Sequence, residues 1–150
     1  MEPMEHMKPI HRPQLPCRIP LSHQIPSGSK LFITATPKMN AERFAVNFLS
    51  PTEHFLHIRV DFEGGMGKGH VVRNSTVNGQ WQNEERQVSS FPFKRGITFD
   101  MVITLNPAEV LVEVNGAFLL KFVPRINVPL QKVNAIEIRG DLTVQRILFQ

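Results

Sequence analysis

The chain has 150 residues, of which 41% are hydrophobic and 20% are charged, a composition typical of a single globular domain. Its formal net charge is +4, but Lys and Arg form no run of five or more, so the sequence does not favour a nucleic-acid partner. The single cysteine, Cys17, excludes an intrachain disulfide and fits a reducing compartment. No secretory signal is evident, and no apolar run approaches the roughly 20 residues that cross a bilayer, so we expect no membrane insertion.

The first 15 residues contain Met, Pro, His and Lys without apolar periodicity. They predict a flexible N-terminal tail over residues 1–15, followed by one folded domain over residues 16–150. Cys17 lies at the start of that domain. A lone cysteine there is usually a small buried hydrophobe, whereas an exposed thiol would be open to oxidation.

Short stretches of β-forming residues follow along the domain. The clearest is 54–62, where His57, Arg59 and Asp61 alternate with apolar residues, which predicts a strand with one face in a core and one polar face. The other predicted strands are Leu31–Thr36, Arg43–Phe48, His70–Val72, Thr98–Thr104, Glu109–Val114, Ala117–Phe122, Ala135–Arg139 and Leu142–Phe149. Because no segment keeps a helical periodicity for three turns, this spacing predicts a single copy of an all-β sandwich or barrel.

Turns containing glycine separate several of these strands. Asn115-Gly116 is a strong two-residue hairpin signal, and Asn78-Gly79 forms a second short turn. The segment Gly64–Gly69 could suggest a phosphate-binding loop, but it lacks the Gly-Lys-Ser/Thr ending and no helical pattern follows it. A hairpin loop is the better interpretation of that segment.

The only tryptophan of the chain, Trp81, lies close to Glu84 and Arg86. A flat aromatic face next to charged hydrogen-bonding groups suits a sugar ring, whose C–H patch stacks while its hydroxyls accept and donate directional bonds. The same segment also fits a half-buried core tryptophan with a solvated charge run behind it. The segment alone does not separate the two interpretations.

Six motifs follow one another in an order known from one family. They are Ala41–Phe48 (A-x-R-F-x-V-N-F), Val71–Ser75 (V-V-x-N-S/T), Trp81–Arg86 (W-x-x-E-x-R), Phe91–Phe99, Val112–Gly116 and Ile138–Asp141. In these motifs the chain resembles the galectins, the β-galactoside-binding lectins, over about residues 16–149. The resemblance implies a jelly-roll, antiparallel β-sandwich of two sheets that binds galactose-containing glycans, is not an enzyme and needs no cofactor.

The resemblance also implies a role for each site residue. Trp81 would stack on the apolar face of galactose, while Asn74 and Glu84 would bond its hydroxyls. Arg86 would hold Glu84 and reach the second sugar. His57 would accept a hydrogen bond from the axial hydroxyl that distinguishes galactose.

The strand that carries His57 departs from the family's pattern. Where the family has H-x-N-x-R, this chain has Arg59 at the Asn position and Asp61 at the Arg position. An ionised Asp only accepts hydrogen bonds, so Asp61 cannot replace a donor to the axial hydroxyl and the ring oxygen. Arg59 and Asp61 could pair with each other, or either could reach Glu84 or Arg86 on the adjacent strand.

Two functions therefore remain open for the domain. The first is a glycan-binding lectin whose β-galactoside affinity is weakened or altered, with carbohydrate contacts from His57, Arg59, Asp61, Asn74, Trp81, Glu84 and Arg86. The second is a galectin-fold protein that has lost sugar binding and acts as a protein-interaction or structural module. The Arg59–Asp61 pair favours the second, and the other site residues favour the first.

Metal and catalytic sites are not indicated. His54 and His57 are three residues apart, which on a regular strand places them on opposite faces. No Ser/His/Asp grouping or carboxylate pair is visible, so we expect no catalytic residues, no metal and no cofactor. The resemblance implies a cytoplasmic protein that can leave cells without a signal peptide. Because edges of such sandwiches often pair between chains, a homodimer is one expected arrangement.

Overall fold

A computed structural model describes residues 8–64, 68–125 and 128–150 of the chain. The strands are β1 (Ile10–His11), β2 (Cys17–Pro20), β3 (Ser29–Pro37), β4 (Arg43–Leu49), β5 (His54–Phe62), β6 (Gly69–Asn74), β7 (Thr76–Val77), β8 (Gln80–Trp81), β9 (Phe99–Leu105), β10 (Val110–Val114), β11 (Ala117–Phe122), β12 (Ala135–Gly140) and β13 (Leu142–Phe149). One turn of 3-10 helix covers Leu130–Lys132. No helix in these three ranges has the length and apolar character of a membrane span.

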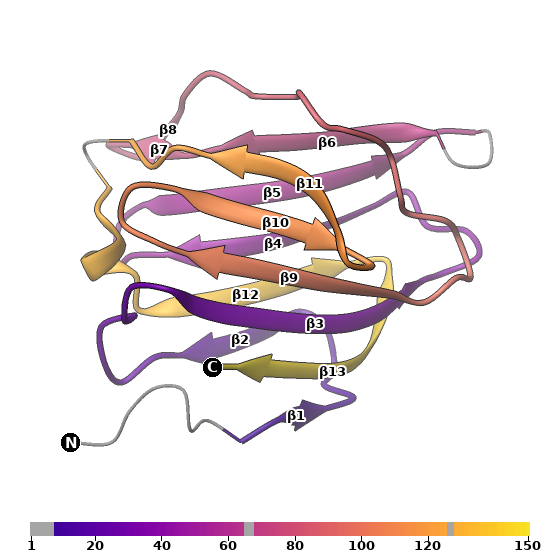
Figure 1. Cartoon of the computed structure of the whole chain (residues 1–150), viewed down its shortest axis with the longest axis horizontal. Coiled ribbons are helices and arrows are strands. Elements are labelled where there is room, and N and C mark those ends of the chain that lie inside the picture. The colour runs from indigo at the N-terminus through magenta and orange to yellow at the C-terminus, as the bar shows by residue number, and fades with distance from the viewer. Residues whose placement is uncertain (1–7, 65–67, 126–127) are drawn as a thin grey trace.

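Two antiparallel sheets pack face to face (Figure 1). One sheet has the strand order β1-β13-β3-β9-β10-β11, the other has the order β2-β12-β4-β5-β6, and β7 pairs with β8 in a small separate sheet. The predicted all-β, antiparallel sandwich of two sheets is therefore confirmed. Each predicted strand is present, and its ends differ by at most two residues from the expected ends.

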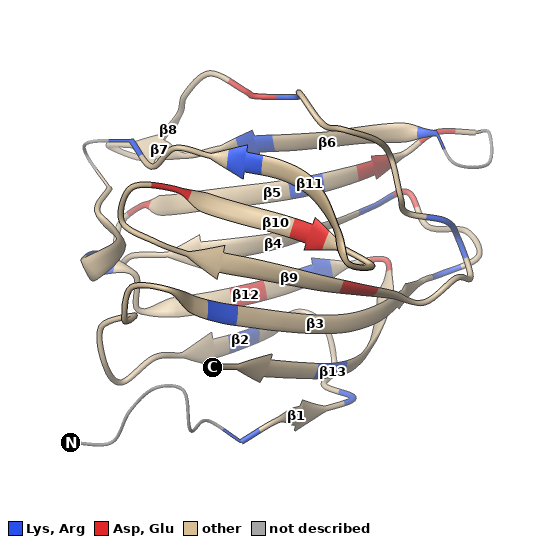
Figure 2. Ribbon diagram, viewed as in Figure 1, with Lys and Arg blue, Asp and Glu red and all other residues tan. Residues whose placement is uncertain are grey.

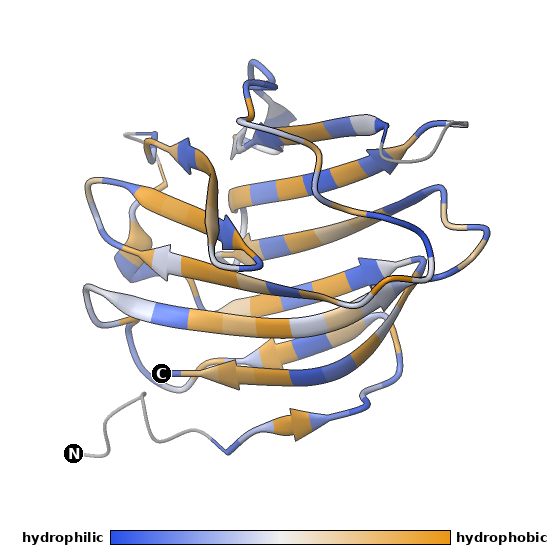
Figure 3. Cartoon of the chain, turned by 45° about the vertical axis from the view of Figure 1, so that its right-hand side comes forward, coloured by the Kyte–Doolittle hydropathy of each residue, from blue (hydrophilic) through white to orange (hydrophobic). Residues whose placement is uncertain are grey.

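The space between the sheets is filled by apolar side chains from alternate positions of the strands. Figure 3 shows this alternation as bands of hydrophobic and hydrophilic residues along each strand. In β3 every second residue is buried, from Ser29 to Pro37. Phe99 stacks on Phe44 with ring centroids 5.6 Å apart and meets Phe93 edge-on at 5.0 Å. Phe93 belongs to the long segment between β8 and β9, so this aromatic cluster also packs that segment against the core.

The two short turns have the backbone that their residues require. Asn115 and Gly116 adopt φ values of 53° and 80°, and Asn78 and Gly79 adopt 53° and 75°. Two successive residues with positive φ give a type I′ turn, which matches the twist of the strands it joins. The first turn joins β10 to β11, and the second joins β7 to β8, which ends at Trp81.

A bulge in β5 corrects one expectation from the sequence. Phe48 of β4 pairs with Leu56, but the next residue, Leu49, pairs with His54, so Phe55 is an extra residue in β5. An extra residue reverses the alternation of side chains beyond it. His54 and His57 therefore lie on the same face, with ring centroids 6.0 Å apart, and the expectation of opposite faces was wrong.

The N-terminal region also differs from the expected tail. Ile10 and His11 pair with Ile147 and Arg146 of β13, so β1 forms an edge of the larger sheet. Backbone pairing of this kind needs no apolar periodicity, so the residue pattern does not predict it. Residues 1–7 lie outside the described residues, as do positions 65–67 of the predicted Gly64–Gly69 loop.

Candidate functional site

The candidate site lies on the face of the smaller sheet that points away from the core. On this face of β5, the side chains of His57, Arg59 and Asp61 follow one another, each partly exposed. His57 is paired with Asn74 of β6 on one side. An open depression of about 420 Å³ is lined by His57, Arg59, Asn74, Trp81, Gln82 and Glu84. The fold thus brings together five of the seven residues predicted from the sequence, and the other two, Asp61 and Arg86, bond to residues of the lining.

Trp81 is presented to solvent rather than packed in the core. Its exposed fraction is 51%, and it is not part of the hydrophobic core, so the interpretation as a core tryptophan is wrong. The indole ring contacts two imidazoles, with centroid distances of 4.7 Å to His54 and 4.9 Å to His57. His54 is a site residue that the sequence reasoning missed, because only the bulge at Phe55 turns it toward the indole.

The small β7–β8 hairpin that carries Trp81 is tied to β5 by a chain of hydrogen bonds. The backbone N–H of His54 donates to the Thr76 hydroxyl at 2.8 Å, and that hydroxyl donates to the Glu53 carboxylate at 2.7 Å. The same carboxylate oxygen accepts from the backbone N–H of Gly79 at 3.0 Å. These bonds lower the pKa of Glu53, with the Thr76 bond as the largest cause. The hairpin therefore has a fixed position beside β5.

The hydrogen bonds around His57 determine which of its two ring nitrogens carries the proton and which one is left as an acceptor. Asn47 Nδ2 donates to the Glu137 carboxylate at 3.0 Å, which leaves Asn47 Oδ1 as an acceptor for His57 Nδ1 at 2.6 Å. The Nδ1 atom therefore carries the proton, and Nε2 has a free lone pair. Burial, together with the nearby His54 and Arg59, lowers the pKa of His57 to about 4. The imidazole is neutral near neutral pH.

Arg59 and Asp61 form the ion pair that the sequence allowed. Arg59 Nε lies 3.1 and 3.0 Å from the two carboxylate oxygens of Asp61, and Nη2 lies 2.9 Å from Oδ2. The third guanidinium nitrogen, Nη1, lies 3.9 Å from Glu84 Oε2. Asp61 is also 3.5 Å from Arg43 Nε on the neighbouring β4. The two substituted residues therefore neutralise each other within the site.

Glu84 is held from its other side by Arg86. Arg86 Nε and Nη2 donate to Glu84 Oε1 at 3.2 and 2.8 Å. This contact is the main cause of the lowered pKa of Glu84, with smaller contributions from the charges of Arg86 and Arg59. Glu84 Oε2 thus remains as an acceptor between Arg59 and the depression.

Asn74 is buried and mostly committed to its neighbours. Its exposed fraction is 3%, its Nδ2 donates to the backbone oxygen of Gln82, and its Oδ1 accepts from Ser75 N and from Arg125 Nη1. Both lone pairs of Oδ1 are used, so one Nδ2 hydrogen is left for a ligand. Arg125 was missed by sequence reasoning, because it lies about 50 positions along the chain from the residues it supports.

Figure 2 shows basic and acidic residues on several strands and loops of both sheets. Among the described residues, no group of three or more His, Cys, Asp or Glu side chains is arranged to hold a metal ion. Cys17 is a partly buried free thiol, and burial raises its pKa.

Comparison with known proteins identifies a family. The model of the galactoside-binding lectins matches residues 16–149. Galectin-4 of Sus scrofa is 32% identical over 151 residues, covering 98% of this chain and 45% of that protein. The 32 kDa beta-galactoside-binding lectin of Caenorhabditis elegans is 32% identical over 130 residues, covering 87% of this chain and 44% of that protein. The chain thus spans about half the length of these curated relatives.

The fold agrees with this assignment. The crystal structure of Caenorhabditis elegans galectin LEC-6 superposes with a TM-score of 0.84 at 30% sequence identity, covering 95% of each chain. The chain therefore belongs to the galectins, the galactoside-binding lectins, which bind carbohydrate and are not enzymes.

Proposed function

We propose that this protein binds glycans in the depression beside Trp81, and that Arg59 and Asp61 weaken or alter its specificity for β-galactosides. The observation that carries the proposal is the closed Arg59–Asp61 ion pair, since two of the three Arg59 nitrogens already donate to the carboxylate. The donor that the family's Arg offers to the sugar has no equivalent in this arrangement, because Asp61 only accepts.

The remaining groups support binding of some sugar. Trp81 offers an exposed indole, His57 Nε2 and Glu84 Oε2 offer acceptors, and Asn74 keeps one N–H donor. Because the indole contacts His54 and His57, a pyranose ring would have to stack on the part of Trp81 that these imidazoles leave open. The site thus offers a stacking surface, two acceptors and the N–H donors of Asn74 and of Arg59 Nη1, which together can bond the hydroxyls of a sugar.

A paired substitution tests the role of the two altered residues. In the Arg59→Asn, Asp61→Arg double variant, we expect affinity for lactose to rise at least about tenfold, because a lost hydrogen-bond partner typically costs 1–3 kcal/mol. Isothermal titration calorimetry and retention on immobilised lactose measure the change. The matched control is Arg59→Asn alone, which leaves the acceptor-only Asp61 in place and should not raise the affinity.

One result with the wild-type protein would contradict the proposal. Tight lactose retention by the wild-type protein, abolished by Trp81→Ala, would contradict weakened β-galactoside binding. A glycan array then identifies which sugars the unmodified site accepts.

A second candidate function is favoured by the packing of the site. Trp81 is in contact with two imidazoles, and both lone pairs of Asn74 Oδ1 are used within the protein. Such internal contacts are also expected in a protein-interaction or structural module that does not bind sugar. The fluorescence of the sole tryptophan separates the two. An emission that does not change at high lactose, together with no bound glycan on an array, supports the second function.

A further inference from the structure

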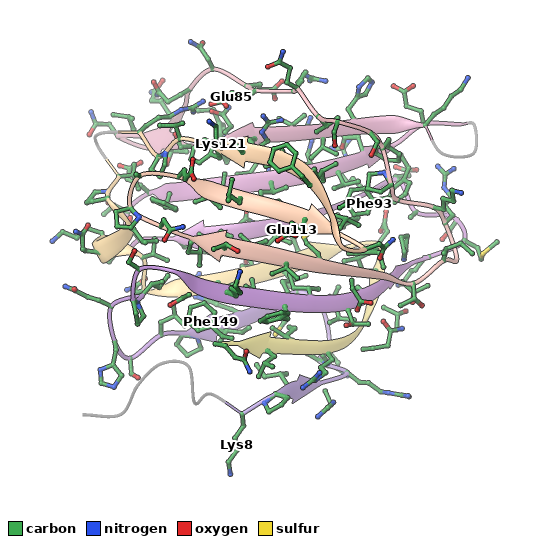
Figure 4. The ribbon with its side chains drawn as sticks, viewed as in Figure 1. Lys8, Glu85, Phe93, Glu113, Lys121 and Phe149 are labelled. Atoms are coloured by element: carbon green, nitrogen blue, oxygen red, sulfur yellow. The ribbon has the colours of Figure 1, made fainter. Side chains whose placement is uncertain are left out.

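A separate hollow lies at the edge of the larger sheet, between β11 and the segment that follows β8. In Figure 1 this segment passes along β11 at one end of the molecule. The hollow has a volume of about 470 Å³, within the usual range of small-molecule sites. We call it the edge groove, and its lining consists of Arg73, Glu85, Gln87, Val88, Ser89, Phe118, Leu119, Leu120, Lys121 and Val123. Figure 4 labels Glu85 and Lys121, which come from the two segments that border it.

The groove has an apolar rim. Phe118 and Val123 are 55% and 57% exposed, which places both among the large hydrophobic side chains that the described residues leave in solvent. Both belong to the lining. Two such residues beside one hollow provide an apolar surface that a ligand could cover.

One of the lining residues, Arg73, is a buried cation with an unsatisfied donor. Arg73 has an exposed fraction of 4%, and its Nη1 and Nη2 donate to the backbone oxygens of Gln87 and Lys121. Its Nε atom is buried and has no hydrogen-bond partner among the described residues. A buried donor without a partner is costly, and native proteins seldom leave one unexplained. Burial also lowers the pKa of this guanidinium, which a bound anion would counteract.

Charge complementarity favours a negatively charged ligand. Glu85 is 4.0 Å from Arg73 Nη2 but is bonded at 2.8 Å to Arg125, which neutralises it. Arg73 and Lys121 thus provide an excess of positive charge in the groove, which attracts an anion. A planar carboxylate matches the geometry of a guanidinium.

The edge of β11 is not open to an added peptide strand at this place. The backbone oxygens of Phe118 and Leu119 accept from the hydroxyl and the N–H of Ser89, and the oxygen of Lys121 accepts from Arg73. Strand addition needs these carbonyl groups. The groove therefore fits a ligand that binds through side-chain contacts.

We propose that the edge groove binds a small amphipathic carboxylate, with its carboxylate facing Arg73 and Lys121 and its apolar body covering Phe118 and Val123. This site is distinct from the glycan depression, and none of the residues named in the proposal lines that depression.

Nuclear magnetic resonance with ¹⁵N-labelled full-length protein tests the proposal without any sugar present. Titration with octanoate, below its micelle concentration, should shift the Arg73 Nε–H resonance and the amides of Phe118 and Val123 in a saturable way. Octanol, which has the same chain without the charge, should bind at least about fivefold more weakly, since charge-assisted hydrogen bonds are about twice as strong as neutral ones.

Two variants and a control complete the experiment. Lys121→Gln and Phe118→Ser, both at exposed positions, should each weaken octanoate binding several-fold, whereas Lys132→Gln, an exposed lysine outside the groove, should leave it unchanged. Failure of octanoate to shift the Arg73 Nε–H resonance, or equal affinities for octanoate and octanol, would overturn the proposal. Because no glycan is present, either result is independent of the proposed lectin function.

Discussion

His57 shows how a residue's role depends on its hydrogen bonds. Asn47 fixes the proton on Nδ1, so the nitrogen that faces the depression accepts rather than donates. The pKa of about 4 keeps this state through the neutral range. An imidazole held in this way can take a hydrogen bond from a sugar hydroxyl but loses that ability once it is protonated.

The pH dependence of stability should report this arrangement. The unfolded chain protonates His57 near its ordinary pKa of 6.5, whereas the folded state resists protonation down to about 4. The unfolded state therefore binds more protons in this window, and stability falls as pH decreases from 6.5 toward 4. Allowing for partial exposure, we expect a loss of roughly 1–2 kcal/mol in the free energy of unfolding between near pH 7 and near pH 5. Urea denaturation measures it, and a His57→Gln variant with the same pH slope would contradict the assignment.

At the scale of elements, the bulge in β5 shapes the site. Without Phe55 as an extra residue, His54 would point into the sandwich and Trp81 would contact only one imidazole. The chain of bonds through Thr76 and Glu53 then holds the β7–β8 hairpin against the bulge. The position of the indole is thus set by an irregularity in one strand and by a hairpin outside both main sheets.

A substitution of His54 should expose Trp81. In His54→Ala, we expect a red-shifted emission and faster acrylamide quenching, because aromatic contacts worth about 0.5–1.5 kcal/mol are lost. His54→Phe keeps an aromatic ring beside the indole and serves as the matched control, with emission close to wild type. Identical emission and quenching in the Ala variant and the wild type would show that His54 does not position Trp81.

At the scale of the whole molecule, the aromatic cluster joins the two sheets to the segment that crosses between them. Phe44 comes from the smaller sheet, Phe99 from the larger one, and Phe93 from the segment between β8 and β9. All three are almost fully buried. The packing of this cluster therefore stabilises the sandwich and the path of the chain from one sheet to the other.

Truncation of this cluster should destabilise the entire domain. For Phe99→Ala we expect a loss of about 3–5 kcal/mol in the free energy of unfolding, since a large buried ring leaves a cavity. Chemical denaturation measures the loss, and Phe99→Leu should cost less because it fills more of the space. A similar loss for Phe118→Ala, whose ring is largely exposed, would argue against the core assignment.

The edge strands of the two sheets could pair with those of a second copy of the chain. We propose a homodimer formed through sandwich edges, for which β1 and β2 are candidates because each ends its sheet. Light scattering over a range of concentrations measures the mass of the particle against the 17.1 kDa of one chain. A constant monomeric mass would contradict this proposal.

The sequence by itself was sufficient to place most of the strands along the chain and to name most residues of the candidate site, but not to give the order of strands within the sheets. Alternation along residues 54–62, the Asn-Gly turns and the six motifs depend on local patterns, and a period of two directly encodes which face a side chain occupies. The pairing of Arg59 with Asp61 was also foreseeable, because residues two apart share a strand face.

Other features depended on contacts that no local pattern encodes. The bulge at Phe55 is visible only from the register of β4 against β5, and it alone brings His54 to Trp81. Arg125 reaches Asn74 and Glu85 from a distant part of the chain, and β1 is ordered by backbone pairing with β13. The burial of Arg73, which follows the predicted strand His70–Val72, comes from the packing of β6 against the segment 85–89. Periodicity assigns a side chain to a face, but register and long-range packing decide which groups it meets there.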